Sequence, residues 1–199
     1  MDVFKLIAAA LAGYLIGCFS FSILISRFFF GKDVRQKGSG NAGATNMARS
    51  FGIVPGLITL LGDAAKAALA LLIGRFLGGE TGLCIAGAAC IAGHCFPVYY
   101  GFRGGKGVSA GLTVLLFADW RAGIAGLIVF AAVALLTKKV SPSSLCAAVA
   151  GTLACILLKC SLPRILMIAF TAVLVFIRHS ENIRRLIRGE EPDFHIKKD

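Results

Sequence analysis

Long stretches without a charged residue dominate this chain and limit what it can fold into. The runs from Leu6 to Ser26 and from Thr81 to Phe102 are each long enough to cross the hydrocarbon core of a bilayer, which takes about 20 helical residues. Hydrophobic residues make up 57% of the 199 residues and charged residues only 16%, whereas soluble domains carry about 25% charge. A disordered chain, a disulfide scaffold and an ordinary soluble globule are therefore excluded.

Further apolar runs follow one another along the rest of the chain. The one from Ile53 to Leu77 is interrupted by Asp63, Lys66 and Arg75, and the one from Gly107 to Ala118 is the shortest. The full set covers residues 6–26, 53–77, 81–102, 107–118, 122–137, 140–158 and 165–177. These runs predict an all-α, polytopic integral membrane protein with seven transmembrane helices, forming a single domain over residues 1–199. The first run lacks a convincing cleavage site, so we interpret it as a span and not as a signal peptide.

Basic residues are unevenly distributed among the segments between the runs. Lys and Arg number 21 against 10 Asp and Glu. One set of alternating segments holds Arg27, Lys32, Arg35, Lys37, Arg49, Arg103, Lys106, Lys138, Lys139, Arg178, Arg184, Arg185, Arg188, Lys197 and Lys198. The other set holds only Lys5, Arg75, Arg121, Lys159 and Arg164. By the positive-inside rule, the N-terminus is expected outside and the C-terminus in the cytoplasm.

The same distribution argues against nucleic-acid binding. The cations form short clusters between apolar runs, as expected beside an anionic lipid leaflet, and do not line a surface interleaved with aromatic residues. Seven cysteines are present, an odd number, without any C-x-x-C spacing. They are Cys18, Cys84, Cys90, Cys95, Cys146, Cys155 and Cys160. We interpret them as small buried side chains and predict no metal site and no cofactor.

The first polar segment, residues 37–46, reads KGSGNAGATN and is followed by Arg49. Its glycines leave backbone N–H groups accessible to a ligand, and the segment leads into a predicted helix. Neutral hydrogen-bonding side chains and two cations accompany them. The residues that could contact a phosphate are Gly38, Ser39, Gly40, Asn41, Thr45, Asn46 and Arg49. A flexible polar loop that needs glycine for its turns is an equally good interpretation.

The second polar segment, residues 93–109, reads GHCFPVYYGFRGGKGVS. It is not a nucleotide P-loop, because Tyr100 stands at the first required glycine and Gly107 follows Lys106 where Ser or Thr is needed. A lysine surrounded by Gly104, Gly105 and Gly107 still suits a phosphate. A basic stop signal at the end of a span would account for the cations but not for the glycines. His94 is expected to be a buried structural histidine.

The third polar segment, residues 178–191, follows the last run and reads RHSENIRRLIRGEE. In a helix, His179, Asn182 and Ile183 would share one face, which is unusual for a purely solvated helix. Two weaker features remain. Asp63 and Lys66 are spaced i, i+3 inside a run, where mutual pairing is expected. The loop 138–144 adds two lysines and the hydroxyls of Ser141 and Ser144.

Together, GSGNAGATN, GHCFPVYYGFRGGKGVS and HSENIRRLIRGEE, in this order on a mostly apolar chain, resemble one family. It is the bacterial acyl-phosphate-dependent glycerol-3-phosphate acyltransferases. The resemblance extends over essentially the whole chain. Arg103 stands where such proteins often have Lys, and the 138–144 loop is only loosely similar. The resemblance implies seven helices in the bacterial inner membrane and an active site that faces the cytoplasm.

It also implies the reaction and its partners. The family transfers an acyl group from acyl phosphate to glycerol 3-phosphate, giving 1-acylglycerol 3-phosphate (lysophosphatidic acid) and phosphate, in the first step of phospholipid synthesis, without a cofactor or metal. The catalytic residues would be Ser39, Arg49, Lys106, His179 and Asn182. The substrate-binding residues would be Gly38, Gly40, Asn41, Thr45, Asn46, Gly104, Gly105, Gly107, Ser141, Ser144 and Glu181. The proton of the acceptor hydroxyl would pass either to His179 or to a phosphate oxygen of a substrate.

The sequence has three competing interpretations. A small polytopic transporter of phosphorylated or anionic metabolites would place polar groups across the depth of the membrane, whereas here they collect on one side. An acyl-CoA-dependent acyltransferase would carry H-x-x-x-x-D, but Tyr99 and Arg184 follow the two histidines at that spacing. A regulatory partner of lipid synthesis without turnover is compatible with the sequence. Membrane lipids are expected partners, and the oligomeric state is left open.

Overall fold

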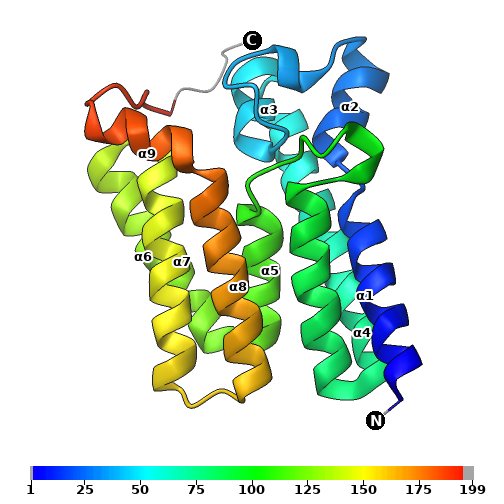
Figure 1. Cartoon of the computed structure of the whole chain (residues 1–199). Coiled ribbons are helices and arrows are strands. Elements are labelled where there is room, and N and C mark those ends of the chain that lie inside the picture. Colours follow the sequence, from blue (N-terminus) through cyan, green and yellow to red (C-terminus); the bar gives the residue numbers. More distant parts are fainter. Residues whose placement is uncertain (1, 195–199) are drawn as a thin grey trace.

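A computed structural model describes residues 2–194, and within them the chain is helical and contains no strand. The positions Lys197 and Lys198, counted in the charge distribution above, lie outside the described residues. The helices are α1 (Val3–Gly17), α2 (Phe21–Phe30), α3 (Ala44–Phe51), α4 (Ile53–Cys95), α5 (Val108–Ala118), α6 (Trp120–Thr137), α7 (Val140–Leu157), α8 (Leu162–Arg178) and α9 (Ser180–Ile187). Short 3-10 turns cover Val34–Gln36 and Val98–Tyr100. The long helices run side by side as a bundle, with α2, α3 and α9 at one end (Figure 1).

Helix α4 is a hairpin of two legs that turns at Gly78 and Gly79. The backbone leaves helical geometry at both residues, and Gly79 has a φ of 61°, which glycine adopts without strain. Next to the turn, the two legs pack so closely that a Cβ on Gly74 of the first leg would lie 2.4 Å from the carbonyl oxygen of Gly82 in the second. The two predicted runs 53–77 and 81–102 therefore become the two legs of one hairpin.

The first predicted run is broken, although it was expected to be a single helix. Helix α1 ends at Gly17 and α2 begins at Phe21. The intervening carbonyl of Phe19 has lost its helical partner and accepts a hydrogen bond from Lys66 Nζ. This bond satisfies a backbone group that would otherwise be unpaired in an apolar environment.

Helix α1 lies directly against α4 through glycines. A Cβ on Gly17 would lie 2.2 Å from the carbonyl oxygen of Cys90, and a Cβ on Gly93 would lie 2.2 Å from that of Tyr14. Small residues at such contacts allow two helix backbones to approach closely, which is how helices associate in lipid. This contact fixes the C-terminal end of α4, where the second polar segment begins.

Four helical stretches are long and apolar enough to cross a membrane: Val3–Phe30, Ile53–Tyr100, Trp120–Thr137 and Val140–Leu157. The number rises to five if α8 and α9, which meet at a bend of 59°, count as one broken span. The chain is thus a multi-pass membrane protein by the length and apolar composition of its helices. Helix α5, with 11 residues, is the short apolar helix that the sequence indicated.

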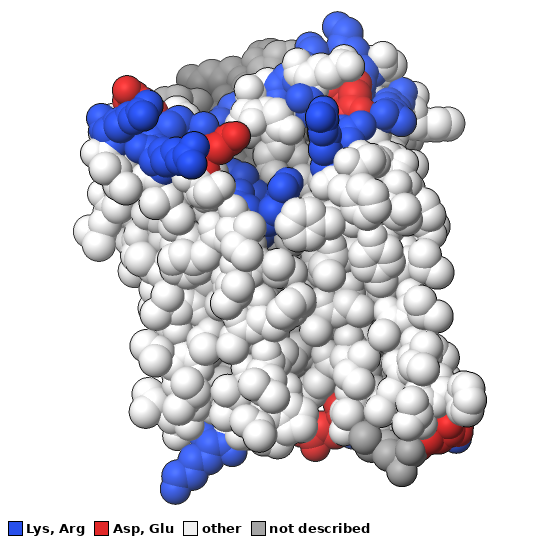
Figure 2. Space-filling view, viewed as in Figure 1, with Lys and Arg blue, Asp and Glu red and all other residues white. Residues whose placement is uncertain are grey.

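Charge is concentrated at the end of the bundle that carries α2, α3 and α9. Figure 2 shows Lys and Arg gathered there, with a hollow that is also lined by cations, and an uncharged band across the middle of the face shown. The start of α1 lies at the opposite end of the bundle (Figure 1). All three polar segments found in the sequence reach this basic end.

Candidate functional site

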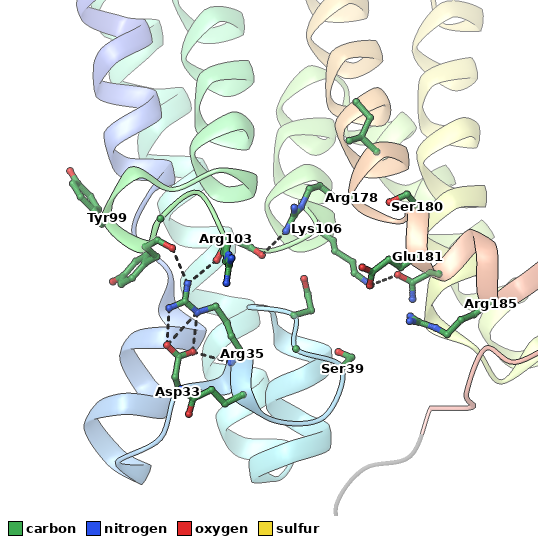
Figure 3. A pocket seen from close by; sticks show the side chains of 18 of the residues that line it. Asp33, Arg35, Ser39, Tyr99, Arg103, Lys106, Arg178, Ser180, Glu181 and Arg185 are labelled. Atoms are coloured by element: carbon green, nitrogen blue, oxygen red, sulfur yellow. Dashed lines mark hydrogen bonds and ion pairs between the residues drawn. The ribbon is translucent and has the colours of Figure 1, made fainter.

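Two cavities open at the basic end of the bundle. The first has a volume of about 910 Å³ and is lined by polar and cationic residues of the three polar segments (Figure 3). The second, of about 870 Å³, starts among the same segments and continues between α5, α6, α7 and α8. Five residues line both cavities: Ser39, Asn41, Lys106, Asn182 and Arg185. These shared residues mark the place where the two cavities meet.

The first polar segment is shaped by the side chain of Asn46. Its Nδ2 lies 3.0–3.1 Å from the carbonyl oxygens of Val34, Lys37 and Asn41, which share its two hydrogens, and its Oδ1 accepts from the backbone N–H of Ser39 at 2.9 Å. Asn46 is 1% exposed. These bonds occupy the amide on both sides, so Asn46 holds the loop in shape around Ser39.

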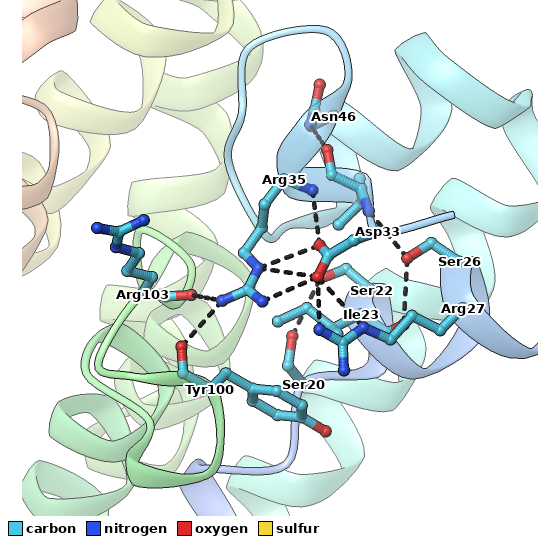
Figure 4. Close-up of polar contacts among 11 residues, drawn as sticks. Ser20, Ser22, Ile23, Ser26, Arg27, Asp33, Arg35, Asn46, Tyr100 and Arg103 are labelled. Carbon is cyan, nitrogen blue, oxygen red and sulfur yellow. Dashed lines mark hydrogen bonds and ion pairs between the residues drawn. The ribbon is translucent and has the colours of Figure 1, made fainter. Parts of the chain in front are cut away.

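A charged network behind this loop links it to the second polar segment (Figure 4). Asp33 accepts from the guanidinium groups of Arg27 and Arg35, at distances down to 2.8 Å. Hydrogen bonds from Arg35, which outweigh the effect of burial, hold the pKa of Asp33 well below its usual range. Arg35 also donates to the carbonyl oxygens of Tyr100 at 2.9 Å and Arg103 at 3.3 Å. Arg35 therefore ties two loops together, a role that the sequence did not reveal.

The second polar segment is fastened to the end of α4. The backbone N–H groups of Gly104 and Gly105 donate to the carbonyl oxygens of Cys95 and His94, at 3.2 and 3.0 Å. A Cβ on Gly104 would lie 2.1 Å from the His94 carbonyl oxygen. On the other side, Arg178 donates to the carbonyl oxygens of Gly104 and Gly105, at 3.0 and 3.1 Å. These bonds determine where Lys106, the next residue, projects.

Lys106 lies where the two cavities meet, and its Nζ donates to Oδ1 of Asn182. Burial lowers the pKa of Lys106 to about 8. Of the smaller contributions, the charge of Glu191 raises this pKa, and the charges of Arg185 and Arg178 lower it. A lysine with this pKa is mostly charged at neutral pH, and an anion beside it would stabilise the charge further.

His179 stands at the bend between α8 and α9 and is 2% exposed. Its Nδ1 lies 2.7 Å from the carbonyl oxygen of Val175. Since a carbonyl can only accept, we assign the proton to Nδ1, which leaves Nε2 as an acceptor. Burial, reinforced by the charge of Lys106, lowers the pKa of His179 to about 4. The ring is therefore neutral at neutral pH.

Glu191 connects the end of α9 to α7 and to Asn182. Its carboxylate accepts from Ser141 Oγ and Asn182 Nδ2, both at 2.7 Å, and from Arg185 Nε at 2.8 Å. Burial alone would raise the pKa of Glu191, but these hydrogen bonds outweigh it and lower the pKa. With Lys106 on its Oδ1 and Glu191 on its Nδ2, Asn182 is held in one amide orientation. Arg178 and Glu191 belong to the third polar segment, but no feature of the sequence distinguished them from its surface charges.

The remaining predicted residues are distributed between the two cavities. Gly40, Gly104 and Glu181 line the first, and the residues that line the second are Gly38, Thr45, Asn46, Arg49, Gly107, Ser141, Ser144 and His179. Arg49 has no hydrogen bond or ion pair among the contacts recorded for residues 2–194. Gly105 lines neither cavity, since it packs against His94. The hydroxyl of Ser144 donates to the Val140 carbonyl oxygen at 2.9 Å.

A buried charged cluster supports the site from inside the bundle. Lys66 Nζ lies 2.9 Å from Asp63 Oδ1, so the pairing predicted from the sequence is present. The same ammonium lies 2.9 Å from His94 Nδ1, and Ser109 Oγ donates to Asp63 Oδ2 at 3.4 Å. The cluster thus joins the two legs of α4 to the start of α5.

The inner part of the second cavity is apolar. Leu112 and Leu115 of α5, Leu127 and Phe130 of α6, and Ile168 of α8 line it. A ligand with a polar head at Lys106 and a hydrocarbon tail among these side chains matches this lining. Within residues 2–194 no group of three or more His, Cys, Asp or Glu side chains is placed to hold a metal ion.

Comparison with known proteins agrees with this geometry. The family model described as "Glycerol-3-phosphate acyltransferase" matches residues 7–189. A glycerol-3-phosphate acyltransferase of Caulobacter vibrioides is 42% identical over 192 residues, covering 96% of this chain and 88% of the relative. One from Carboxydothermus hydrogenoformans is 36% identical over 193 residues, covering 97% and 98%.

Two solved structures are also similar. Both are of PlsY, an integral membrane glycerol 3-phosphate acyltransferase. The glycerol 3-phosphate form has a TM-score of 0.90 and 31% identity and covers 96% of each chain. The lysophosphatidic acid form has a TM-score of 0.88 and 29% identity, covering 96% of this chain and 95% of that one. The chain belongs to the glycerol-3-phosphate acyltransferase family.

The lowered pKa of Lys106 predicts that anion binding at this site depends on pH. We expect the affinity for inorganic phosphate to fall as the pH rises through about 8, because Lys106 then loses its charge while phosphate is already a dianion. Titration calorimetry between pH 7 and 10 measures this. In Lys106→Arg the decline should move to higher pH, since a guanidinium stays protonated there. An identical pH dependence in both proteins would show that another group titrates.

Proposed function

We propose that this chain transfers an acyl group from acyl phosphate to glycerol 3-phosphate, giving 1-acylglycerol 3-phosphate and inorganic phosphate. The observation that carries this proposal is the meeting of a cationic cavity and an apolar one at Ser39, Lys106 and Asn182. Such a site can hold two phosphate groups side by side while a hydrocarbon chain extends between the helices. Membership of the family supplies the acyltransferase activity and the acceptor. Acyl phosphate as the donor is part of the proposal.

The two substrates would use different parts of the site. Gly38, Ser39, Gly40 and Asn41 would hold one phosphate through backbone N–H and side-chain groups, with Thr45 at the start of α3 nearby. The glycerol 3-phosphate would be bound by Arg49, Lys106, His179 and Asn182, assisted by Ser141, Ser144 and Glu181. Asn46, Gly104, Gly105 and Gly107 would shape the two loops and would not contact substrate. The acyl chain would lie among Leu112, Leu115, Phe130 and their neighbours.

The reaction needs positioning and charge stabilisation more than acid–base assistance. The acceptor hydroxyl oxygen attacks the acyl carbon, a new ester C–O bond forms, and the C–O bond to phosphate breaks. The hydroxyl proton passes to a phosphate oxygen, so that the leaving group departs as hydrogen phosphate. Lys106 and Arg49 offset the repulsion between the two anions, which at an effective dielectric constant of 20 is about 4 kcal/mol for unit charges 4 Å apart.

His179 would orient the acceptor hydroxyl without removing its proton. Before attack, its Nε2 can accept a hydrogen bond from that hydroxyl, and the hydrogen then turns to the phosphate oxygen that takes it. With a pKa of about 4 the ring is a weaker base than a phosphate dianion, whose conjugate acid has a pKa of about 6. We expect His179→Ala to lower kcat only about tenfold and to leave the shape of the pH–rate profile unchanged. A general base typically contributes 10²–10⁴-fold. A loss beyond 100-fold that also removes the acidic limb would assign the proton to His179.

A donor comparison tests the activity itself. Purified protein should form lysophosphatidic acid from palmitoyl phosphate and glycerol 3-phosphate, release phosphate in equal amount, and be inactive with palmitoyl-CoA. A chelator should change nothing, since no metal takes part in the proposed step. Lys106→Met, purified in parallel, is the control for contaminating acyltransferases and should be inactive. Binding of both ligands without turnover would favour transport, and turnover with palmitoyl-CoA would overturn the donor assignment.

We further propose that the chain crosses the bilayer seven times, with its N-terminus outside and its C-terminus in the cytoplasm of a bacterial cell. The crossing segments would be α1, the two legs of α4, α5, α6, α7 and α8. Helix α4 spans Ile53–Cys95, which at 1.5 Å per residue would be about twice as long as the ~30 Å hydrocarbon core, so its two legs would cross separately. The concentration of cations at the end that carries the cavities supports this orientation.

Side-specific labelling tests the orientation. In a cysteine-free background, Lys32→Cys and Arg188→Cys should react with a membrane-impermeant maleimide only after the cells are opened, because both exposed positions lie at the basic end. Lys5→Cys, exposed at the opposite end, is the matched control and should react in intact cells. Labelling of Lys32→Cys and Arg188→Cys on different sides would contradict the proposed topology and the shared site.

A further inference from the structure

His94 is a buried histidine that the proposed reaction does not yet use. It is the penultimate residue of α4, is 5% exposed, and lines the second cavity. One edge of its ring faces the buried pair Asp63–Lys66, with Nδ1 at 2.9 Å from Lys66 Nζ and 3.6 Å from Asp63 Oδ1. The two ring nitrogens therefore have different surroundings.

The charged pair determines which nitrogen carries the proton. Lys66 Nζ donates to the carbonyl oxygen of Phe19, forms an ion pair with Asp63 Oδ1, and lies 2.9 Å from His94 Nδ1. An ammonium group has three hydrogens and accepts none, so Nδ1 must accept. In the neutral ring, we assign the proton to Nε2. The pair thus fixes His94 as a hydrogen-bond donor on the edge opposite to Lys66.

That donor has no partner. Among the hydrogen bonds of residues 2–194, none involves His94 Nε2. Gly105 packs against this edge of the ring, and a Cβ there would lie 2.2 Å from Nε2, so any larger residue at position 105 would displace the ring or cover Nε2. Nε2 is not among the fully enclosed unpaired side-chain atoms of the described residues, and His94 lines the second cavity. Polar groups inside a protein are usually paired, so one left unpaired in a cavity wall indicates an acceptor that arrives with a ligand.

The position of His94 in the cavity indicates which acceptor it would meet. Lys106 and Ser39 lie at the polar end of this cavity, and Leu112 and Leu115 line its apolar part. His94 shares the wall between them with Gly107, Val108 and Ser109. Helix α5 begins there, and the N–H groups of its first turn have no acceptor within the helix. In an acyl phosphate, the atom between the phosphate and the hydrocarbon chain is the carbonyl oxygen.

We propose that His94 Nε2–H donates a hydrogen bond to the carbonyl oxygen of the acyl donor and stabilises the negative charge that develops there during attack. This rests on the proposed function. As the acceptor hydroxyl adds to the acyl carbon, the C=O electron pair moves onto this oxygen, and it returns when the bond to phosphate breaks. The proton of His94 stays on Nε2 throughout. Asp63 and Lys66 are positioning residues, because they act only through the tautomer of His94.

Two substitutions separate donation to the substrate from support of the fold. His94→Asn places an amide oxygen where Nδ1 accepts from Lys66 but removes the group at Nε2. His94→Gln extends an amide N–H towards the position of Nε2. We expect His94→Asn to lower kcat about 100-fold, as removal of an oxyanion donor does elsewhere, with the KM for glycerol 3-phosphate within twofold. His94→Gln should regain at least fivefold over His94→Asn. If His94 only supported the fold, His94→Asn, which keeps the hydrogen bond with Lys66, would have a higher kcat than His94→Gln.

Infrared spectroscopy can detect the proposed hydrogen bond between His94 and the carbonyl oxygen of the donor. The probe is a long-chain ketophosphonate, labelled with ¹³C at the carbonyl, in which a methylene replaces the bridging oxygen and prevents turnover. Its bound C=O stretch should lie at lower frequency in the wild-type protein than in His94→Asn. Equal frequencies, or a kcat for His94→Asn within threefold of wild type, would overturn the proposal. Wild-type turnover with acyl phosphate in the same series shows that the proposed function itself holds.

A measurement on the unmodified protein covers the case in which neither variant folds. In ¹⁵N-histidine-labelled protein, His94 should show a protonated Nε2 and an unprotonated Nδ1, and the Nε2 signal should shift when the ketophosphonate is added. A proton on Nδ1, or an Nε2 signal that does not respond to saturating probe, would overturn the proposal. This readout requires only binding, so it is independent of turnover.

Discussion

The site depends on how the C-terminal end of α4 is capped. A helix ends with carbonyl groups that have no partner, and in an apolar bundle each must find one inside the protein. Here the carbonyls of His94 and Cys95 accept from the backbone of Gly105 and Gly104, and a Cβ on either glycine would lie within 2.2 Å of an atom of His94. Arg178 then fixes the carbonyls of the same two glycines from the other side. One capping arrangement therefore ends the helix, sets the loop and aims Lys106 at the junction of the cavities.

Cations at the basic end divide into those that hold the structure and those left for ligands. Arg35 directs its guanidinium to Asp33 and to two carbonyl oxygens, and Arg178 directs its own to two more. Lys106 contacts only an amide oxygen, and Arg49 has no recorded partner in residues 2–194. A cation already paired with a carboxylate contributes little net attraction for a further anion. This difference separates Lys106 and Arg49 from Arg35 and Arg178 better than their position in the sequence does.

Much of the fold was predictable because it follows from local composition. The apolar runs predicted each long helix, and the spacing of Asp63 and Lys66 predicted their pairing. The break between α1 and α2 was not predictable, because it depends on Lys66, 47 residues away from Phe19 along the chain. Likewise Asn46 was expected to face a ligand but is occupied by four backbone groups of its own loop. Contacts of this kind involve residues whose type is suited equally to binding and to support, and only the packed structure distinguishes the two roles.

Two buried histidines illustrate how the surroundings determine chemical roles. His179 donates from Nδ1 to the Val175 carbonyl oxygen, which leaves Nε2 as an acceptor, whereas His94 accepts at Nδ1 from Lys66, which leaves Nε2 as a donor. Both line the same cavity. A hydroxyl that is held ready for attack needs an acceptor to orient it, and a carbonyl oxygen that gains charge needs a donor. In the proposed reaction, the two rings, held as opposite tautomers by a backbone carbonyl and by an ammonium group, would meet these two needs, and neither would change its protonation.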